Sequence, residues 1–124
     1  MFRNYCLVVS VLAIAYGVGY TLMPSVIASL YFESPGSQVS AMARYFGLTL
    51  LGNGVMLWLL KDVADIAVRN AVVSGFLVSG VVGLVTSVVL VLNGTMQVFG
   101  WSAAIIYLII AVWSLLVRKS VTTA

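Results

Sequence analysis

The residues that could carry out acid–base, metal or redox chemistry are few in this chain of 124 residues. It has no histidine, one cysteine (Cys6) and three acidic residues (Glu33, Asp62 and Asp65). Catalysis and metal binding need several such groups within bonding reach of one another, and a thiol redox motif needs a second cysteine. We therefore expect no catalytic residue, no metal or cofactor site and no enzymatic activity.

Four long apolar stretches fill the chain, and none of the three acidic residues lies within them. The composition is 63% hydrophobic and 7% charged, whereas a soluble domain carries about 25% charged residues. A helix of about 20 apolar residues crosses the hydrocarbon layer of a bilayer. The sequence predicts an all-α integral membrane protein with one domain, residues 1–124, folded as an up-down bundle of four transmembrane helices. The predicted spans are residues 5–23, 41–60, 71–92 and 98–117.

The connection between the first two stretches is the longest, and it favours a short helix. Pro24 suits the first turn of a helix. Four apolar residues that follow would share one face, Val26, Ile27, Leu30 and Tyr31, and would let such a helix lie flat at the membrane interface. The alternative is an irregular loop pressed against the bundle. Tyrosine and tryptophan side chains near the span ends fit interfacial belts; these are Tyr5, Tyr20, Tyr31, Trp58, Trp101 and Trp113.

The positions of the basic residues predict the orientation of the chain. Five of the six lysines and arginines flank one side of the predicted bundle, namely Arg3, Lys61, Arg69, Arg118 and Lys119. Only Arg44 belongs to the other side. Because positive residues stay cytoplasmic, we expect both termini in the cytoplasm. In the 61–70 connection, Lys61, Asp65 and Arg69 are spaced four apart, which predicts solvated helical ion pairs. No basic stripe with interleaved aromatics indicates nucleic-acid binding.

Arg44 is the one ionisable residue that enters a predicted span. It lies about 10 Å along the second helix when counted from Ser37. Three interpretations stay open. Its guanidinium could reach the outer headgroups, pair with Glu33, or bind an anionic headgroup or substrate.

Neutral polar residues form a stripe on the same predicted helix. Tyr45, Thr49 and Asn53 are spaced four apart and share one face. Asn53 lies near mid-membrane, where it could hydrogen-bond another helix or contact a neutral substrate. Arg44 lies about half a turn of the helical wheel from Asn53, so a straight helix does not place the two in one site. We take Arg44, Tyr45, Thr49 and Asn53 as candidate ligand or lipid contacts.

The third stretch carries small residues at every fourth position, which is typical of tight helix packing in membranes. This helix-packing seam comprises Ala71, Gly75, Ser79, Gly83 and Ser87. We expect the first helix to be its partner, because that helix has its own row of Ala13, Gly17 and Thr21. A partner helix from another chain is the alternative. The second stretch carries Gly47 and Gly54, seven apart on one face.

Scattered short motifs give the chain a likeness to known proteins. They are Ala43-Arg44-Tyr45-Phe46-Gly47 with Gly52 and Trp58, Met23-Pro24 with Leu30-Tyr31, and Gly100-Trp101. With these motifs the chain resembles a broad group of small bacterial four-helix membrane proteins of unknown function. The resemblance implies a four-helix fold in the bacterial cytoplasmic (inner) membrane, and it provides no known activity that could be transferred to this chain. Small multidrug-resistance transporters differ, since they need a glutamate in a first helix that here has no acid.

Two functions follow as hypotheses from these patterns. The first is a multi-pass inner-membrane protein without enzymatic chemistry, acting as an accessory or assembly subunit. Its partners would be the lipid bilayer and either a second copy or a larger membrane complex. The alternative is a small transporter or binder of neutral, lipophilic or anionic molecules that uses Arg44 and the stripe of Tyr45, Thr49 and Asn53.

Overall fold

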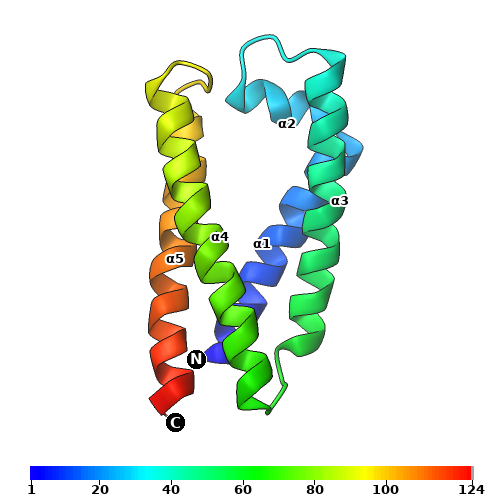
Figure 1. The fold of residues 1–124 in the computed structure, drawn as a ribbon. Helices are drawn as coiled ribbons and strands as arrows, with labels where there is room; N and C mark the ends of the chain where they lie inside the picture. The colour runs from blue at the N-terminus through cyan, green and yellow to red at the C-terminus, as the bar shows by residue number, and fades with distance from the viewer. Residues whose placement is uncertain (124) are drawn as a thin grey trace.

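All regular structure within residues 1–123, the part of the chain that the computed structural model describes, is helical. The five helices, shown in Figure 1, are α1 (Phe2–Leu22), α2 (Pro24–Tyr31), α3 (Ser37–Leu60), α4 (Ile66–Leu92) and α5 (Gly100–Thr123). The predicted all-α class is confirmed. The segment after Pro24 forms the short helix α2 in place of an irregular loop.

Within the described residues, three helices are long and apolar enough to cross a membrane: Phe2–Leu22, Ile66–Leu92 and Gly100–Val121. Together they indicate a multi-pass membrane protein. Helix α3 has 24 residues, a sufficient length, but it is not among the three. Its mean hydropathy is lower because Arg44 and Asn53 interrupt its apolar residues.

The helix ends differ from the predicted spans where capping residues act. Helix α4 begins at Ile66, five residues before the predicted start, because Oδ1 of Asp65 accepts a hydrogen bond from the Val68 amide at 3.1 Å. This N-cap satisfies one of the free amides of the first turn. The helix ends before Asn93, and Gly94 follows with φ of +83°. Glycine adopts this left-handed conformation at little cost.

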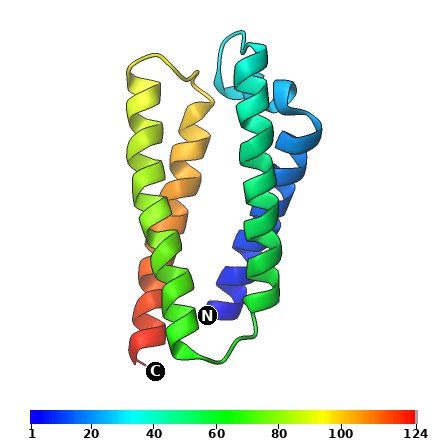
Figure 2. The same cartoon turned by 45° about the vertical axis from the view of Figure 1, so that its right-hand side comes forward.

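The four long helices pack as two antiparallel pairs. Helix α1 packs against α3 and α4 against α5 along most of their lengths, whereas contacts between the pairs are fewer. Both chain termini lie at the same end as the α3–α4 connection, as Figures 1 and 2 show. We call this the termini end. The opposite end, which carries α2 and the α4–α5 connection, is called the α2 end.

The two pairs meet in a buried core near the termini end. The core residues are Phe2, Tyr5, Cys6 and Val9 of α1, Leu57 of α3, Val73 of α4, and Val117 and Val121 of α5. The hydroxyls of Tyr5 and Ser114 lie 2.7 Å apart and form a buried hydrogen bond between α1 and α5. In lipid such bonds and close packing hold helices together, because burial of apolar surface contributes little.

Helix α2 joins the two pairs at the other end. The carbonyl of Tyr31 accepts a hydrogen bond from the Gln97 amide at 2.7 Å. The Tyr31 ring packs edge-on against Phe99, with 5.1 Å between ring centroids. Because Gln97 and Phe99 belong to the α4–α5 connection, these contacts tie the α1–α3 pair to the α4–α5 pair.

Candidate functional site

Arg44 lies on α3 toward the α2 end, and α1 holds one of its nitrogens. Nε of Arg44 donates a hydrogen bond to the Thr21 carbonyl at 3.2 Å. Thr21 is in the last turn of α1, where carbonyls lack a partner within the helix. Within the described chain Arg44 forms no ion pair, so the pairing with Glu33 is absent. Among the described residues, the two terminal nitrogens of the guanidinium have no hydrogen-bond partner.

A cavity of about 350 Å³ opens beside Arg44. Its lining residues are Pro24 and Ser25 of α2, Pro35 and Gly36 of the connection, and Ser37, Ser40, Ala41 and Arg44 of α3. Oγ of Ser25 and Oγ of Ser40 lie 3.2 Å apart, which joins α2 to α3. Arg44 is the one charged residue in this lining, so the cavity is cationic.

The neutral stripe on α3 lies outside this cavity. Tyr45 is 70% exposed, and the Thr49 hydroxyl donates to the Tyr45 carbonyl at 3.2 Å within the same helix. Asn53 is half-buried, and among the described residues its side chain makes no hydrogen bond to another helix. The structure therefore separates Arg44 from Tyr45, Thr49 and Asn53, as the helical spacing of Arg44 and Asn53 implies.

The row of small residues on α4 is divided between two surroundings. Gly83 and Ser87 face α5, where a Cβ added at Gly83 would overlap the Tyr107 ring and Ser87 is 5% exposed. Ala71, Gly75 and Ser79 are exposed, and a Cβ added at Gly75 would meet nothing within 4 Å. We call these three residues the exposed α4 row.

Helical geometry explains this division. An α-helix turns by about 100° per residue, so a spacing of four drifts by about 40° at each step, and five residues spread over about 160°. A spacing of seven drifts by only about 20°. The residues of α4 that are buried follow the seven-residue spacing: Val73, Gly80 and Ser87.

The prediction that α1 is the partner of α4 is wrong, because α4 packs along α5. A Cβ at Gly80 would lie 2.8 Å from the backbone nitrogen of Ala111. Helix α3, and not α4, packs against the small residues of α1. A Cβ at Gly47 would lie 2.9 Å from the Gly17 carbonyl, and one at Gly54 would lie 3.0 Å from the Ser10 carbonyl. Each pair thus has its own close backbone contact.

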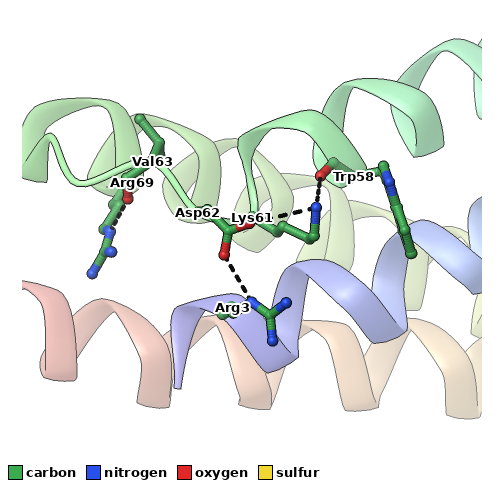
Figure 3. A network of polar contacts seen from close by, with 6 residues as sticks. All are labelled: Arg3, Trp58, Lys61, Asp62, Val63 and Arg69. Atoms are coloured by element: carbon green, nitrogen blue, oxygen red, sulfur yellow. Dashed lines mark hydrogen bonds and ion pairs between the residues drawn. The ribbon is translucent and has the colours of Figure 1, made fainter.

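The termini end carries a network of polar contacts between α1 and the α3–α4 connection, drawn in Figure 3. Nε of Arg3 lies 2.7 Å from Oδ1 of Asp62, and Nζ of Lys61 lies 3.5 Å from Oδ2. Arg69 donates from Nε to the Val63 carbonyl at 2.6 Å. The predicted helical pairs of Asp65 with Lys61 and Arg69 are wrong, because residues 61–65 lie between two helices and Asp65 acts as an N-cap.

This network affects the ionisation of Asp62. The hydrogen bond from Arg3 lowers the pKa of Asp62, and the charges of Arg3 and Lys61 act in the same direction. Both Arg3 and Asp62 are exposed, so the pair fastens the end of α1 to the connection without a buried charge. We assign it an anchoring role.

Sequence reasoning missed the contacts that tyrosine side chains make between helices. Tyr5 and Tyr31 were expected in interfacial belts, yet they are 0% and 5% exposed. Tyr5 bonds Ser114, and burial raises the pKa of Tyr31, whose hydroxyl neighbours are Tyr16 and Ser102. The available signal was the serine inside the apolar stretch of α5, since a hydroxyl buried there needs a partner.

Among the described residues no three histidine, cysteine, aspartate or glutamate side chains come close enough to hold a metal ion. Comparison of the chain with family models, with curated proteins and with solved structures finds no match. The resemblance to small bacterial four-helix membrane proteins therefore stays a prediction.

Proposed function

We propose that this protein is a multi-pass membrane protein without enzymatic chemistry that acts as an assembly or accessory subunit, with the exposed α4 row as its contact surface. In this proposal α3 is the fourth span, and the long helices form an up-down bundle in a bacterial inner membrane with both termini cytoplasmic. The antiparallel packing of α3 along α1 supports the fourth span, because α3 would then share the depth of an apolar helix.

The observation that carries the proposal is the open surface at Gly75. The other glycines that lie well inside the long helices, apart from Gly52 of α3, have a neighbour within 4 Å of an added Cβ. Small residues let helices in lipid approach closely. The neighbouring Val78 and Val82 are also exposed, and they would offer side chains to a helix packed on the row.

We commit to a second copy of this chain as the occupant of the exposed α4 row. Two copies that insert with the same orientation can meet about a two-fold axis normal to the membrane, which places α4 parallel to α4. Parallel packing through small residues at four-residue spacing is a known geometry of membrane helix dimers. Ala71, Gly75 and Ser79 supply this spacing on both sides of the contact.

The test is the mass of the purified full-length protein in a mild maltoside detergent, measured by light scattering corrected for bound detergent. The expected particle is a dimer, and Gly75→Leu should convert it to a monomer that keeps its melting temperature. Gly52→Leu is the matched control, because Gly52 is also exposed with nothing within 4 Å of an added Cβ. A monomeric parent protein, or a dimer that survives Gly75→Leu, would contradict the proposal.

The second candidate is a transporter or binder of small neutral, lipophilic or anionic molecules, and the Arg44 cavity favours its anionic form. Arg44→Ala is expected to abolish uptake of an anionic molecule, or the rise in melting temperature that it induces, while the fold is kept. Asn53→Leu, which lies outside the cavity, tests the neutral form of this candidate in the same way. Both positions are outside the buried core, so neither change should unfold the protein. Parent-like behaviour of both variants would remove this candidate.

A further inference from the structure

A cationic cavity lies where three helix ends come together at the α2 end. Helix α1 ends at Leu22, α2 begins at Pro24 and α3 begins at Ser37. The cavity has a volume of about 350 Å³ and is more open than enclosed, so it suits a small group that stays partly exposed. Its location at the end of the helices would place it at the membrane interface rather than in the hydrocarbon layer.

The charge of this cavity comes from Arg44. The Thr21 carbonyl accepts a hydrogen bond from Nε, and none of the described residues that line the cavity is acidic. The terminal nitrogens of Arg44 have no partner among the described residues. A guanidinium held at one nitrogen presents the remaining donors in a fixed plane, which suits the oxygens of a phosphate group.

Neutral donors surround the same space. The hydroxyls of Ser25 and Ser40 lie 3.2 Å apart on α2 and α3, and Ser37 also lines the cavity. The N-cap residue of α3, Gly36, has no side chain to accept from the first-turn amides. These amides add partial positive charge to that of Arg44.

We propose that the cavity of Arg44, Ser25, Ser37 and Ser40 binds a phosphate group, supplied by the headgroup of an anionic phospholipid or by a free phosphate. A phosphate is favoured over a carboxylate because the polar groups that line the cavity come from two helices, Ser25 from α2 and Ser37, Ser40 and Arg44 from α3. Its three or four oxygens can meet them together, whereas a carboxylate offers two. The inference deepens the binding part of the second candidate function and is independent of assembly through α4.

The test is the melting temperature of the full-length protein in maltoside detergent, titrated separately with three probes. Dihexanoyl phosphatidylglycerol carries the phosphate on a lipid, inorganic phosphate carries it alone, and dihexanoyl glycerol lacks it. We expect a saturable rise with at least one phosphate probe and none with dihexanoyl glycerol. A rise with the lipid alone assigns a headgroup, and a rise with inorganic phosphate as well assigns the phosphate group itself.

Single substitutions show which residues the rise in melting temperature depends on. Arg44→Gln should weaken the apparent Kd by at least about tenfold, as loss of a charged hydrogen bond requires. Lys61→Gln is the control, because it removes the same charge at the termini end, away from the cavity. Ser40→Ala provides a second reading if Arg44→Gln does not fold, with an expected weakening of about fivefold.

The proposal is overturned if neither phosphate probe gives a saturable rise, or if Arg44→Gln and Lys61→Gln lose the response equally. The assay scores binding without transport. If uptake fails while phosphate still binds, the phosphate site remains and only the transport role of the second candidate is ruled out. If phosphate does not bind, the site and the anionic form of the second candidate are both ruled out.

Discussion

Gly75 and Gly80 are five residues apart on α4, yet their surroundings are opposite. A Cβ added at Gly80 would lie 2.8 Å from the Ala111 nitrogen of α5, whereas one added at Gly75 would meet nothing within 4 Å. Five residues turn an α-helix by about 140° beyond a full turn, so the two glycines face nearly opposite sides. One side of α4 is thus used inside the chain, and the other, with equally small residues, is open.

This contrast predicts different effects of the same substitution along α4. Gly80→Ala should destabilise the protein by about 1–3 kcal/mol, because backbone atoms of Ala111 cannot move aside cheaply. Gly75→Ala should leave stability unchanged or raise it by up to about 1 kcal/mol through helix propensity. Gly83→Ala should lie between them, since the Tyr107 ring that it meets can rotate. Reversible unfolding in mixed micelles measures all three, and equal values for Gly75 and Gly80 would contradict the assigned packing.

The α1–α3 pair allows a second comparison. A Cβ at Gly47 would lie 2.6 Å from the Cβ of Tyr20 and 2.9 Å from the Gly17 carbonyl, whereas one at Gly52 would meet nothing within 4 Å. Gly47→Ala should therefore lower the melting temperature in detergent, with a cost of about 1–3 kcal/mol. Gly52→Ala should not lower it. A Gly47→Ala protein as stable as its parent would rule out this close contact.

The bond between Tyr5 and Ser114 should couple the two helix pairs. Both groups are buried, so Tyr5→Phe or Ser114→Ala leaves one hydroxyl partner without a bond. In a double-mutant cycle the coupling energy should be about 0.6–2 kcal/mol, the range found for hydrogen bonds between membrane helices. The cycle is measured by unfolding of the two single variants, the double variant and the parent. A coupling energy of zero would mean that the core, without this bond, holds the pairs together.

The lowered pKa of Asp62 predicts that the stability of the fold depends slightly on pH. This pKa is lowered by the hydrogen bond from Arg3, so the pair stabilises the fold above the unfolded pKa of about 3.9 and loses this effect as pH falls through the folded value. The melting temperature of the parent should fall more than that of Asp62→Asn between about pH 5 and pH 3. Because the pair is exposed, about 1 M salt should remove the difference. Parallel pH profiles at low salt would contradict the anchoring role of the pair.

The apolar stretches predicted the positions of the long helices, and among the described residues three of these helices are long and apolar enough to cross a bilayer. The 41–60 span stays a prediction, since α3 is not among those three. The ends were less accurate where a polar residue caps a helix, as Asp65 does for α4. Pairing could not be read from the rows of small residues. A row such as Ala71 to Ser87 shows that a helix can be approached closely, but α1, α4 and α5 all offer such positions.

The candidate residues show the same contrast between features that depend on one helix, which the sequence predicts, and contacts between distant segments, which it does not. Helical spacing correctly separates Arg44 from Asn53, since it depends only on the geometry of one helix. The cavity beside Arg44 could not be predicted, because it is formed by Ser25 and Ser40 across a turn of the chain whose path no local pattern specifies. Tyr31 was likewise unpredictable as a link, since its partner Phe99 lies 68 positions further along the chain.

If two copies of the chain meet at the exposed α4 row, disulfide cross-linking in native membranes should capture the contact between them. In a Cys6→Ala background, Gly75→Cys should form a disulfide-linked dimer under mild oxidation. Gly52→Cys, at a similar distance from the termini end on α3, should stay monomeric. A Gly75→Cys protein that remains monomeric, or one that cross-links no more than Gly52→Cys, would contradict the proposed contact.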